Sequence, residues 1–333
     1  VREGRVLRFR TAPLIFLGTV LTHLTGGSAG REGAALQLGG CLSGSLGRVL
    51  RLDDKDERII TMCGMAGGFS ALFGTPLAAA VFAMEVESIG VMYYAALVPC
   101  VLSALIANVI SSLFGVASTS FTLAAIPELS AISLLQTIGL GIVFGALASL
   151  FCRAMHTGGT LYKKIENPYL RIVVGGCIVV LLSLLVRSGD YNGAGMSVIS
   201  AALAGHAVPW AFALKIVFTV LTLGAGFKGG EIVPCFFVGA TCGCVVAPLL
   251  GMDAGFGAAL GLIAVFCGVT NSPMTSILLG YELFGGQGLA LLAMCAAVSY
   301  LLSGYSGLYR EQKIIYSKTS PVFIGRKGGE EKQ

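Results

Sequence analysis

The charged pair Arg31 and Glu32 interrupts an otherwise apolar part of the sequence, inside a glycine-rich turn over residues 26–33. A helix that begins at about Gly33 would direct its free N–H groups and the positive end of its dipole toward this turn. Helix N-termini of this kind bind anions. Glu32 places a negative charge where the anion would sit. It is therefore either a gate that competes with the anion and leaves when protonated, or only a cap for the helix.

A second glycine-rich break, residues 224–234, repeats this chemistry. It contains Gly229, Gly230 and Glu231 and ends at Pro234. Proline is favoured at the start of a helix because it lacks only an N–H group that is free there anyway. We interpret Glu231 as structural, because a carboxylate at this point can cap the helix or accept hydrogen bonds from nearby amides.

The backbone amides of Ile232 and Val233 should point at the same volume as the amides near Glu32. Two opposed helix N-termini would then surround a dehydrated anion without presenting a full positive charge. A Lys or Arg at this point would hold the ion too tightly, because turnover requires binding that is weak enough for release. The two breaks together therefore predict one anion site.

The two breaks belong to a longer internal repeat. Pro76 opens an apolar segment that ends in Glu85, and Pro273 opens a similar segment that ends in Glu282. The same number of positions separates the two prolines and the two glutamates, and nearly the same number separates the two glycine-glutamate breaks. Short, broken segments at matching positions of two halves indicate the binding site of a transporter with inverted repeats. Chance similarity between apolar stretches is the alternative, and the matched order argues against it.

The composition requires that these segments lie in a membrane. Of 333 residues, 55% are hydrophobic and only 12% are charged, whereas soluble domains carry about 25% charged residues. Apolar runs that approach the length of a membrane-spanning helix cover residues 11–24, 92–114, 132–151, 172–186, 210–226 and 289–302. The 47 glycines suit closely packed and broken membrane helices. The sequence thus predicts an all-α polytopic membrane protein with an inverted-topology repeat and short broken helices.

The predicted order of elements places both breaks between helices. Fourteen helices are expected, over residues 11–25, 34–50, 59–69, 77–86, 91–114, 131–164, 168–187, 197–205, 208–226, 235–250, 256–268, 274–284, 287–303 and 305–316. Residues 51–58 are expected to form a charged loop, and Glu85 and Glu282 to be structural and close to the water boundary. The expected domains are a basic lead-in (1–10) after an omitted N-terminal part, a membrane domain (11–316) with halves of about 11–165 and 166–316, and a solvated, cytoplasmic polar tail (317–333).

The sequence lacks the residues that other classes of function require. The net charge of +5 comes from Lys and Arg in loops and does not indicate a nucleic-acid surface. Cys242 and Cys244 have no second pair or nearby His, so we expect no metal site and no cofactor. An intramembrane enzyme is an alternative, but the sequence has no H-E-x-x-H motif and no His placed to pair with Ser28. No nucleotide-binding module follows the last helix, so no dependence on ATP is expected.

The motifs at both breaks resemble those of the CLC anion channels and transporters. Gly30-Arg31-Glu32-Gly33 is similar to the family motif G-[KR]-E-G-P, whose Glu forms the external gate. Residues 230–234 stand where the family has G-x-F-x-P. The resemblance covers essentially the whole chain.

The same resemblance implies roles for further residues. Leu308-Tyr309, at the start of the expected last helix, matches the position of the tyrosine whose hydroxyl faces the central anion. The helices that begin at Pro76 and Pro273 resemble the paired interface helices of the family, which implies a homodimer in a lipid bilayer with one pathway in each subunit. Asn271 lies close to a helix start, where it could face the pore.

Departures from the family pattern indicate a branch. Ala34 replaces the proline of the first motif, and Ile232 replaces the phenylalanine of the second. Val86 stands where proton-coupled chloride exchangers carry a second Glu. With the G-G-E-x-x-P form of the second motif, these departures resemble the bacterial fluoride-exporting branch, which exchanges fluoride for protons. A chloride channel or chloride/proton exchanger is the alternative, and the family's first anion-binding loop, which would distinguish them, is not in this sequence.

The resemblance to that branch implies a multi-pass secondary transporter of the bacterial plasma membrane that exports fluoride as protons enter. Fluoride is small and strongly hydrated, so its site needs good hydrogen-bond donors in place of water. The predicted anion-binding residues are Gly30, Arg31, Gly33, Ile232, Val233 and Tyr309. Glu32, with no second Glu at the usual place, would carry the proton from both sides by swinging inward.

Overall fold

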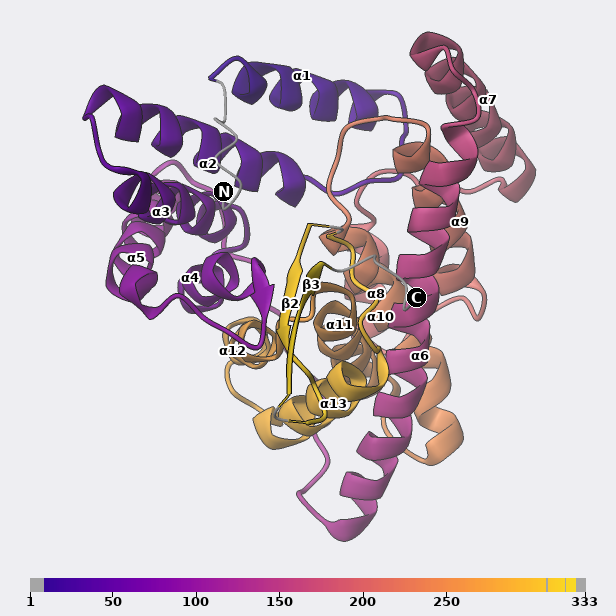
Figure 1. Cartoon of the computed structure of the whole chain (residues 1–333). Coiled ribbons are helices and arrows are strands. Elements are labelled where there is room, and N and C mark those ends of the chain that lie inside the picture. Colours follow the sequence, from indigo (N-terminus) through magenta and orange to yellow (C-terminus); the bar gives the residue numbers. More distant parts are fainter. Residues whose placement is uncertain (1–8, 310, 321, 328–333) are drawn as a thin grey trace.

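The computed structural model describes residues 9–309, 311–320 and 322–327 and shows a mostly helical chain (Figure 1). The α-helices of these residues are α1 (Thr11–Leu24), α2 (Glu32–Val49), α3 (Asp54–Phe73), α4 (Pro76–Glu85), α5 (Leu97–Leu113), α6 (Ala131–Tyr162), α7 (Pro168–Val186), α8 (Met196–Leu203), α9 (Ala211–Gly224), α10 (Ile232–Val246), α11 (Ala254–Thr270), α12 (Pro273–Phe284) and α13 (Leu289–Leu302). The strands are β1 (Ser88–Ile89), β2 (Lys313–Tyr316) and β3 (Phe323–Lys327). The predicted all-α membrane fold is confirmed, while most of the basic lead-in and the end of the tail lie outside the described residues.

Within the described residues, four helical stretches are long and apolar enough to cross a membrane: Tyr94–Leu113, Ala131–Tyr162, Pro168–Val186 and Ile232–Leu250. Five further apolar helices have only 10–17 residues, fewer than the about 20 that a full crossing requires. The longest helix, α6, has 32 residues and runs along one side of the molecule from α13 toward α7 (Figure 1). Full and short helices therefore occur together, as expected for a transporter with broken helices.

Helices α4 and α12 exchange hydrogen bonds across the repeat. Each begins with a proline. The N–H groups of Leu77 and Ala78, in the first turn of α4, each donate to the carboxylate of Glu282 at 2.9 Å. The carboxylate of Glu85 accepts the equivalent bonds from the first turn of α12 at 3.1 and 2.8 Å. Both glutamates have the structural role expected of them, and the side chain of Glu85 is buried against α12.

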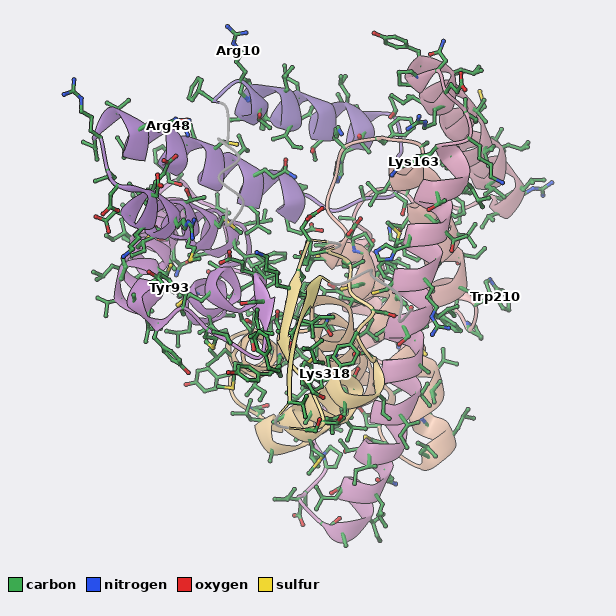
Figure 2. The ribbon with its side chains drawn as sticks, viewed as in Figure 1. Arg10, Arg48, Tyr93, Lys163, Trp210 and Lys318 are labelled. Carbon is green, nitrogen blue, oxygen red and sulfur yellow. The ribbon has the colours of Figure 1, made fainter. Side chains whose placement is uncertain are left out.

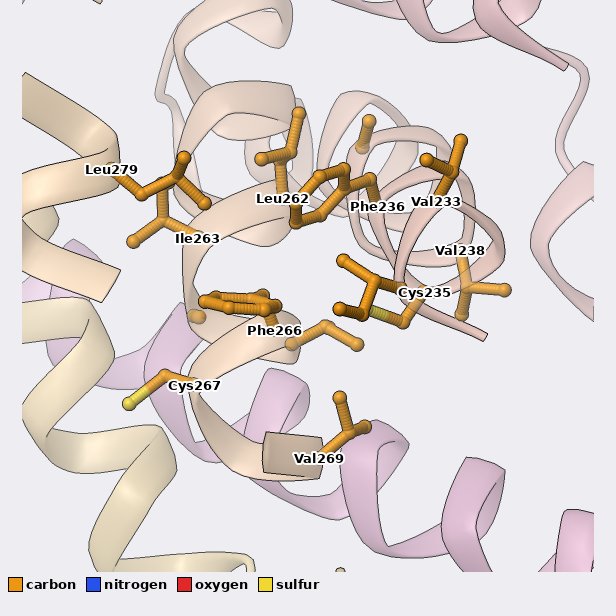
Figure 3. Close-up of a cluster of buried hydrophobic side chains, with 14 of the residues drawn as sticks. Val233, Cys235, Phe236, Val238, Leu262, Ile263, Phe266, Cys267, Val269 and Leu279 are labelled. Carbon is orange, nitrogen blue, oxygen red and sulfur yellow. The ribbon is translucent and has the colours of Figure 1, made fainter. Parts of the chain in front are cut away.

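Helices α10 and α11 form the centre of the buried core (Figure 3). The ring centroids of Phe236 and Phe266, one from each helix, lie 5.3 Å apart. A side chain at Gly239 would overlap the backbone carbonyl of Gly261, so the two helix backbones approach closely at this pair. Helices α2 and α3 approach each other through glycines in the same way. Small residues allow such contacts between membrane helices, which explains the high glycine content.

The charged loop predicted over residues 51–58 is shorter in the structure, because α3 begins at Asp54. The carboxylate of Asp53 accepts hydrogen bonds from the N–H groups of Lys55 and Asp56 at 3.0 and 2.8 Å. This is an N-cap, and the acidic residues of the first turn also favour a helix N-terminus. The prediction was wrong because clustered acidic residues are also typical of the first turn of a helix, and Asp53 supplies the cap that begins it.

The last predicted helix, residues 305–316, is not formed. Strand β2 lies in its place and pairs in parallel with β1 and antiparallel with β3. The β-branched Ile314 and Ile315 favour a strand, and the side chain of Ile314 is buried. Because β3 pairs with β2 and the ammonium group of Lys318 donates to the carbonyl of Tyr300 at 2.9 Å, the tail is not simply solvated as predicted. Figure 1 shows this hairpin in yellow.

Candidate anion site

The two glycine-rich breaks lie against each other. The N–H of Gly30 donates to the carbonyl of Gly230, and the N–H of Gly230 donates to the carbonyl of Gly30, both at 2.8 Å. Ser28 attaches the first break to α9, because its N–H donates to Thr222 Oγ1 at 3.0 Å and its hydroxyl lies 3.0 Å from Thr219 Oγ1. The fold thus brings together two segments that are far apart in the sequence, as the repeat predicted.

Glu32, the first residue of α2, directs its carboxylate onto the N-terminus of α10. The side chain is fully buried, and Oε1 accepts hydrogen bonds from the N–H groups of Ile232 at 2.6 Å and Val233 at 3.1 Å. The backbone amides of Arg31 and of Glu32 itself also face the carboxylate. A helix N-terminus stabilises negative charge through its free N–H groups and its dipole. The carboxylate therefore occupies the position that the sequence predicts for an anion.

Glycines form the wall around this carboxylate. A Cβ at Gly30 or at Gly230 would overlap the carboxyl group of Glu32. A Cβ at Gly33 would lie 3.1 Å from the backbone of Gly229 and Gly230. Within the described residues, Oε2 of Glu32 is buried without a hydrogen-bond partner. The space thus fits a small group of negative charge closely and leaves one acceptor of the carboxylate unsatisfied.

Helix α10 begins at Ile232, two residues before Pro234. The proline is the third residue of the helix, where its missing N–H is still one of the four that have no partner within a helix. The first intrahelical bond runs from the N–H of Cys235 to the carbonyl of Glu231 at 3.1 Å. The first turn therefore offers the N–H groups of Ile232 and Val233, and both donate to the carboxylate.

The side chain of Glu231 makes no cap hydrogen bond to α10, although this residue directly precedes the helix. The capping interpretation is wrong because Glu32, from the other break, already accepts the bonds of the first turn. Glu231 is partly buried and interacts electrostatically with Glu32 and with Tyr309. A second carboxyl group thus lies next to the candidate anion site.

Tyr309 lies in the segment between α13 and β2, and not at the start of a helix as predicted. The N–H of Leu308 donates to the carbonyl of Val269 at 2.9 Å, which attaches this segment to the end of α11. The phenol packs against the apolar core, within electrostatic range of Glu231 and Glu32. The fold therefore brings Tyr309 near both carboxyl groups.

Two predicted site residues direct their side chains elsewhere. The side chain of Arg31 is exposed, so this residue faces Glu32 with its backbone amide only. Asn271 has a left-handed backbone conformation (φ 57°) at the end of α11. Its side chain is hydrogen-bonded to Gln312 and Lys318 and does not line the space at Glu32.

Sequence reasoning missed Lys215, a fully buried cation in α9. Its Nζ donates to the carbonyls of Gly193 at 2.7 Å and Tyr191 at 3.1 Å, and lies 5.0 Å from the ring centroid of Phe237. Gly193 also accepts a hydrogen bond from the N–H of Ala29, so Lys215 secures the loop that supports the first break. The signal was a single Lys within an apolar helix of 14 residues, since ionisable residues inside a membrane are functional candidates by default.

Known proteins resemble this chain over most of its length. The family model described as voltage gated chloride channel matches residues 1–304. A chloride/fluoride channel protein of Pseudomonas syringae is 39% identical over 321 residues, which are 94% of this chain and 71% of that protein. A putative chloride channel protein of Ralstonia nicotianae, described as ClcB-like, is 30% identical over 250 residues, which are 72% of this chain and 57% of that protein.

Solved structures show the same similarity. The crystal structure of a CLC-type fluoride/proton antiporter superposes with a TM-score of 0.88 at 38% identity, covering 91% of this chain and 77% of that chain. The structure of a slow cyanobacterial Cl⁻/H⁺ antiporter superposes with a TM-score of 0.77 at 19% identity, covering 89% and 73%, and shows a shared fold. With the family model matched over nearly the whole sequence, the chain belongs to the voltage-gated chloride channel (CLC) family.

Proposed function

We propose that this protein is a fluoride/proton antiporter in which Glu32 is both the gate and the proton carrier. The observation that carries the proposal is the carboxylate of Glu32, bound as an anion by the N–H groups of Ile232 and Val233. Similarity to a chloride/fluoride channel protein and to a fluoride/proton antiporter supports fluoride as the transported ion.

Exchange follows from competition for the same two N–H groups. While Glu32 is ionised, its carboxylate satisfies them and closes the site. Protonation removes the charge that the helix N-terminus favours, so the carboxyl group leaves and a fluoride ion takes its place. When Glu32 returns and releases its proton on the other side of the membrane, it displaces the anion. The carboxyl group of Glu32 thus carries protons across the membrane in the direction opposite to that of fluoride.

The groups around the site suit a small, strongly hydrated anion. The N–H groups of Ile232 and Val233, the hydroxyl of Tyr309 and the protonated carboxyl group of Glu32 replace the hydrogen bonds that fluoride loses from water. Hydrogen bonds to ions are stronger than those between neutral groups. Lys215 interacts electrostatically with Glu32 while its ammonium group donates to backbone carbonyls. It therefore favours an anion without binding it directly.

A chloride channel is the second candidate, and Val86 is the observation that favours it. Val86 caps the C-terminus of α4, where a second carboxylate would provide an internal proton route. Without that carboxylate, passive chloride flux is the simplest alternative to exchange through Glu32. The similarity to the chloride channel protein of Ralstonia supports this candidate.

Reconstitution in liposomes distinguishes the two candidates. Ion-selective electrodes report the efflux of fluoride or chloride from loaded liposomes, while the external pH reports proton uptake. Fluoride efflux that drives protons inward against their gradient, with little chloride efflux, supports the antiporter. Comparable chloride efflux without proton uptake supports the channel.

The substitution Glu32→Gln tests the proton carrier. Glutamine retains the shape and one acceptor of the side chain but cannot release a proton, so we expect fluoride-driven proton uptake to be lost. Glu57→Gln is the control, because Glu57 pairs with Arg48 at 3.0 Å with both side chains about one third exposed, and such pairs contribute little. Coupled transport that persists in Glu32→Gln would contradict the proposal.

We further propose that the protein forms a homodimer in the bacterial plasma membrane, with the C-terminal hairpin on the cytoplasmic side. Support comes from α5, which packs against α3 and α4 on one face. Its other face carries exposed apolar side chains, namely those of Val98, Leu102, Leu105, Ile106, Val109 and Leu113. A single cysteine introduced at Leu102 should form cross-linked dimers in membrane vesicles. A cross-linking pattern with monomers only would contradict the dimer at this face.

A further inference from the structure

A buried network of polar side chains lies beside the segment that carries Tyr309, and the exchange mechanism above does not involve this network. The segment that carries Tyr309 is closed by a hydrogen bond from the N–H of Gln312 to the carbonyl of Tyr309 at 3.0 Å. The side chains of Gln312 and Asn271 are 3% and 1% exposed. Burial of amide groups is costly unless their polar atoms have partners. These side chains are therefore placed for a definite set of contacts.

The side chain of Gln312 joins the ends of two helices from different halves of the repeat. Its Nε2 donates to the carbonyl of Val86, at the end of α4, at 3.0 Å and to that of Thr270, at the end of α11, at 2.9 Å. Its Oε1 accepts a hydrogen bond from Asn271 Nδ2 at 3.1 Å. Carbonyls at helix C-termini lack partners within the helix, so one side chain satisfies two ends and fixes them relative to the Tyr309 segment.

Lys318 completes the network from the C-terminal hairpin. Its Nζ donates to Asn271 Oδ1 at 2.5 Å, to the carbonyl of Tyr300 at 2.9 Å and to Ser303 Oγ at 3.2 Å. All three protons of the ammonium group are thus used. The group also lies 4.2 Å from the ring centroid of Tyr300. Figure 2 shows Lys318 inside the outline of the molecule, whereas the labelled Arg10 lies at its edge.

We propose that Gln312, Asn271 and Lys318 are positioning residues that fix the phenol of Tyr309 at the anion site and thereby set the affinity for fluoride relative to chloride. This inference rests on the proposed function. The three side chains act on the ion only through the segment that carries Tyr309, which they attach to α4, α11 and α13. A functional group has to be held within about 0.5 Å of its productive position by such supporting contacts. The smaller ion forms the shorter hydrogen bonds and tolerates a displaced hydroxyl less.

The substitution Gln312→Leu tests the proposal in the full chain in liposomes. We expect the KM for fluoride to rise by about tenfold, the scale of coupling between neighbouring groups, with a smaller change in kcat and a lower ratio of fluoride to chloride transport. Gln136→Leu is the matched control, because Gln136 Nε2 also donates to a backbone carbonyl, that of Leu250 at 2.7 Å, in another part of the fold. Its fluoride KM should match that of the unsubstituted protein.

A double-mutant cycle with Tyr309→Phe separates positioning from a general structural effect. If Gln312 acts through the hydroxyl of Tyr309, Gln312→Leu changes the fluoride KM in the unsubstituted protein and leaves it unchanged in the Tyr309→Phe background. Equal effects in both backgrounds, or an unchanged KM in Gln312→Leu, would overturn the proposal. Persistent proton coupling in Glu32→Gln would instead overturn the proposed function, so the two failures are distinguishable.

Two further substitutions keep the proposal testable where Gln312→Leu does not fold. Asn271→Gly removes the amide and retains a residue that adopts positive φ without strain. Lys318→Met removes the ammonium group, while Lys318→Arg keeps a cation with several N–H donors. We expect a raised fluoride KM in Asn271→Gly and Lys318→Met and partial recovery in Lys318→Arg. Identical fluoride KM values in all three variants and the unsubstituted protein would contradict the proposal.

Discussion

The carboxylate of Glu32 reaches the amides of α10 because Gly30 and Gly230 have no side chains. We expect Gly230→Ala to abolish fluoride efflux from liposomes, since its methyl group would overlap the carboxyl group of Glu32. Gly159→Ala is the control, because a Cβ at Gly159 in α6 meets nothing within 4 Å. Normal efflux from Gly230→Ala would show that the glycines do not determine the size of the site.

The second prediction for a single residue concerns Lys318 and the dependence of folding stability on pH. Burial lowers the pKa of this ammonium group, which lies after the last membrane helix, from 10.5 to about 8. Between about pH 8 and pH 10 the unfolded chain keeps a proton that the folded chain has released, so stability rises with pH in this window. From pH 7 to about pH 10, the thermal midpoint of the unsubstituted protein should therefore increase relative to that of Lys318→Met. A constant difference would contradict the expected release of the proton.

Among the elements, α4 and α12 stabilise each other through their termini. Glu85 is 7% exposed and accepts three hydrogen bonds, including one from Thr275 Oγ1 at 2.7 Å, while Glu282 is less buried and accepts two. Hydrogen bonds to charged groups contribute about 1.5–3 kcal/mol each. We therefore expect Glu85→Ala to lower the thermal midpoint of the solubilised protein more than Glu282→Ala, with little change in Glu57→Ala. The reverse order would show that the burial of these contacts does not determine their contribution.

The sequence predicted elements well where a local signal marks their start. Pro76 and Pro273 identified α4 and α12 to within a residue, because proline is tolerated in the first turn of a helix. Strand β2 was mistaken for a helix because a short apolar run fits both structures. Its partner β1 lies far away in the sequence, so the pairing that decides between strand and helix has no local signature.

For the whole molecule, the repeat was the most informative feature of the sequence. It predicted that the amides of Ile232 and Val233 would face the same volume as the amides near Glu32, and in the structure these two amides donate to the carboxylate of Glu32. The roles of Lys215 and Gln312 were not predictable, since their partners are backbone carbonyls whose positions follow only from the tertiary fold. The motif Gly30-Arg31-Glu32-Gly33 placed Arg31 among the anion-binding residues, but its side chain is exposed, because a sequence pattern does not show which way a side chain points.

The bridge between Gly30 and Gly230 has a consequence for biosynthesis. Glu32 is synthesised before the amides that bind it, because these amides belong to a helix that begins 200 residues later in the chain. Until then the carboxyl group has no partner on α10, so it has to stay hydrated or protonated. A cysteine at position 32 should accordingly react with a soluble thiol reagent in a nascent chain arrested before α10, and become protected once α10 has been inserted. Protection of the cysteine in both chains would show that the first half closes the site on its own.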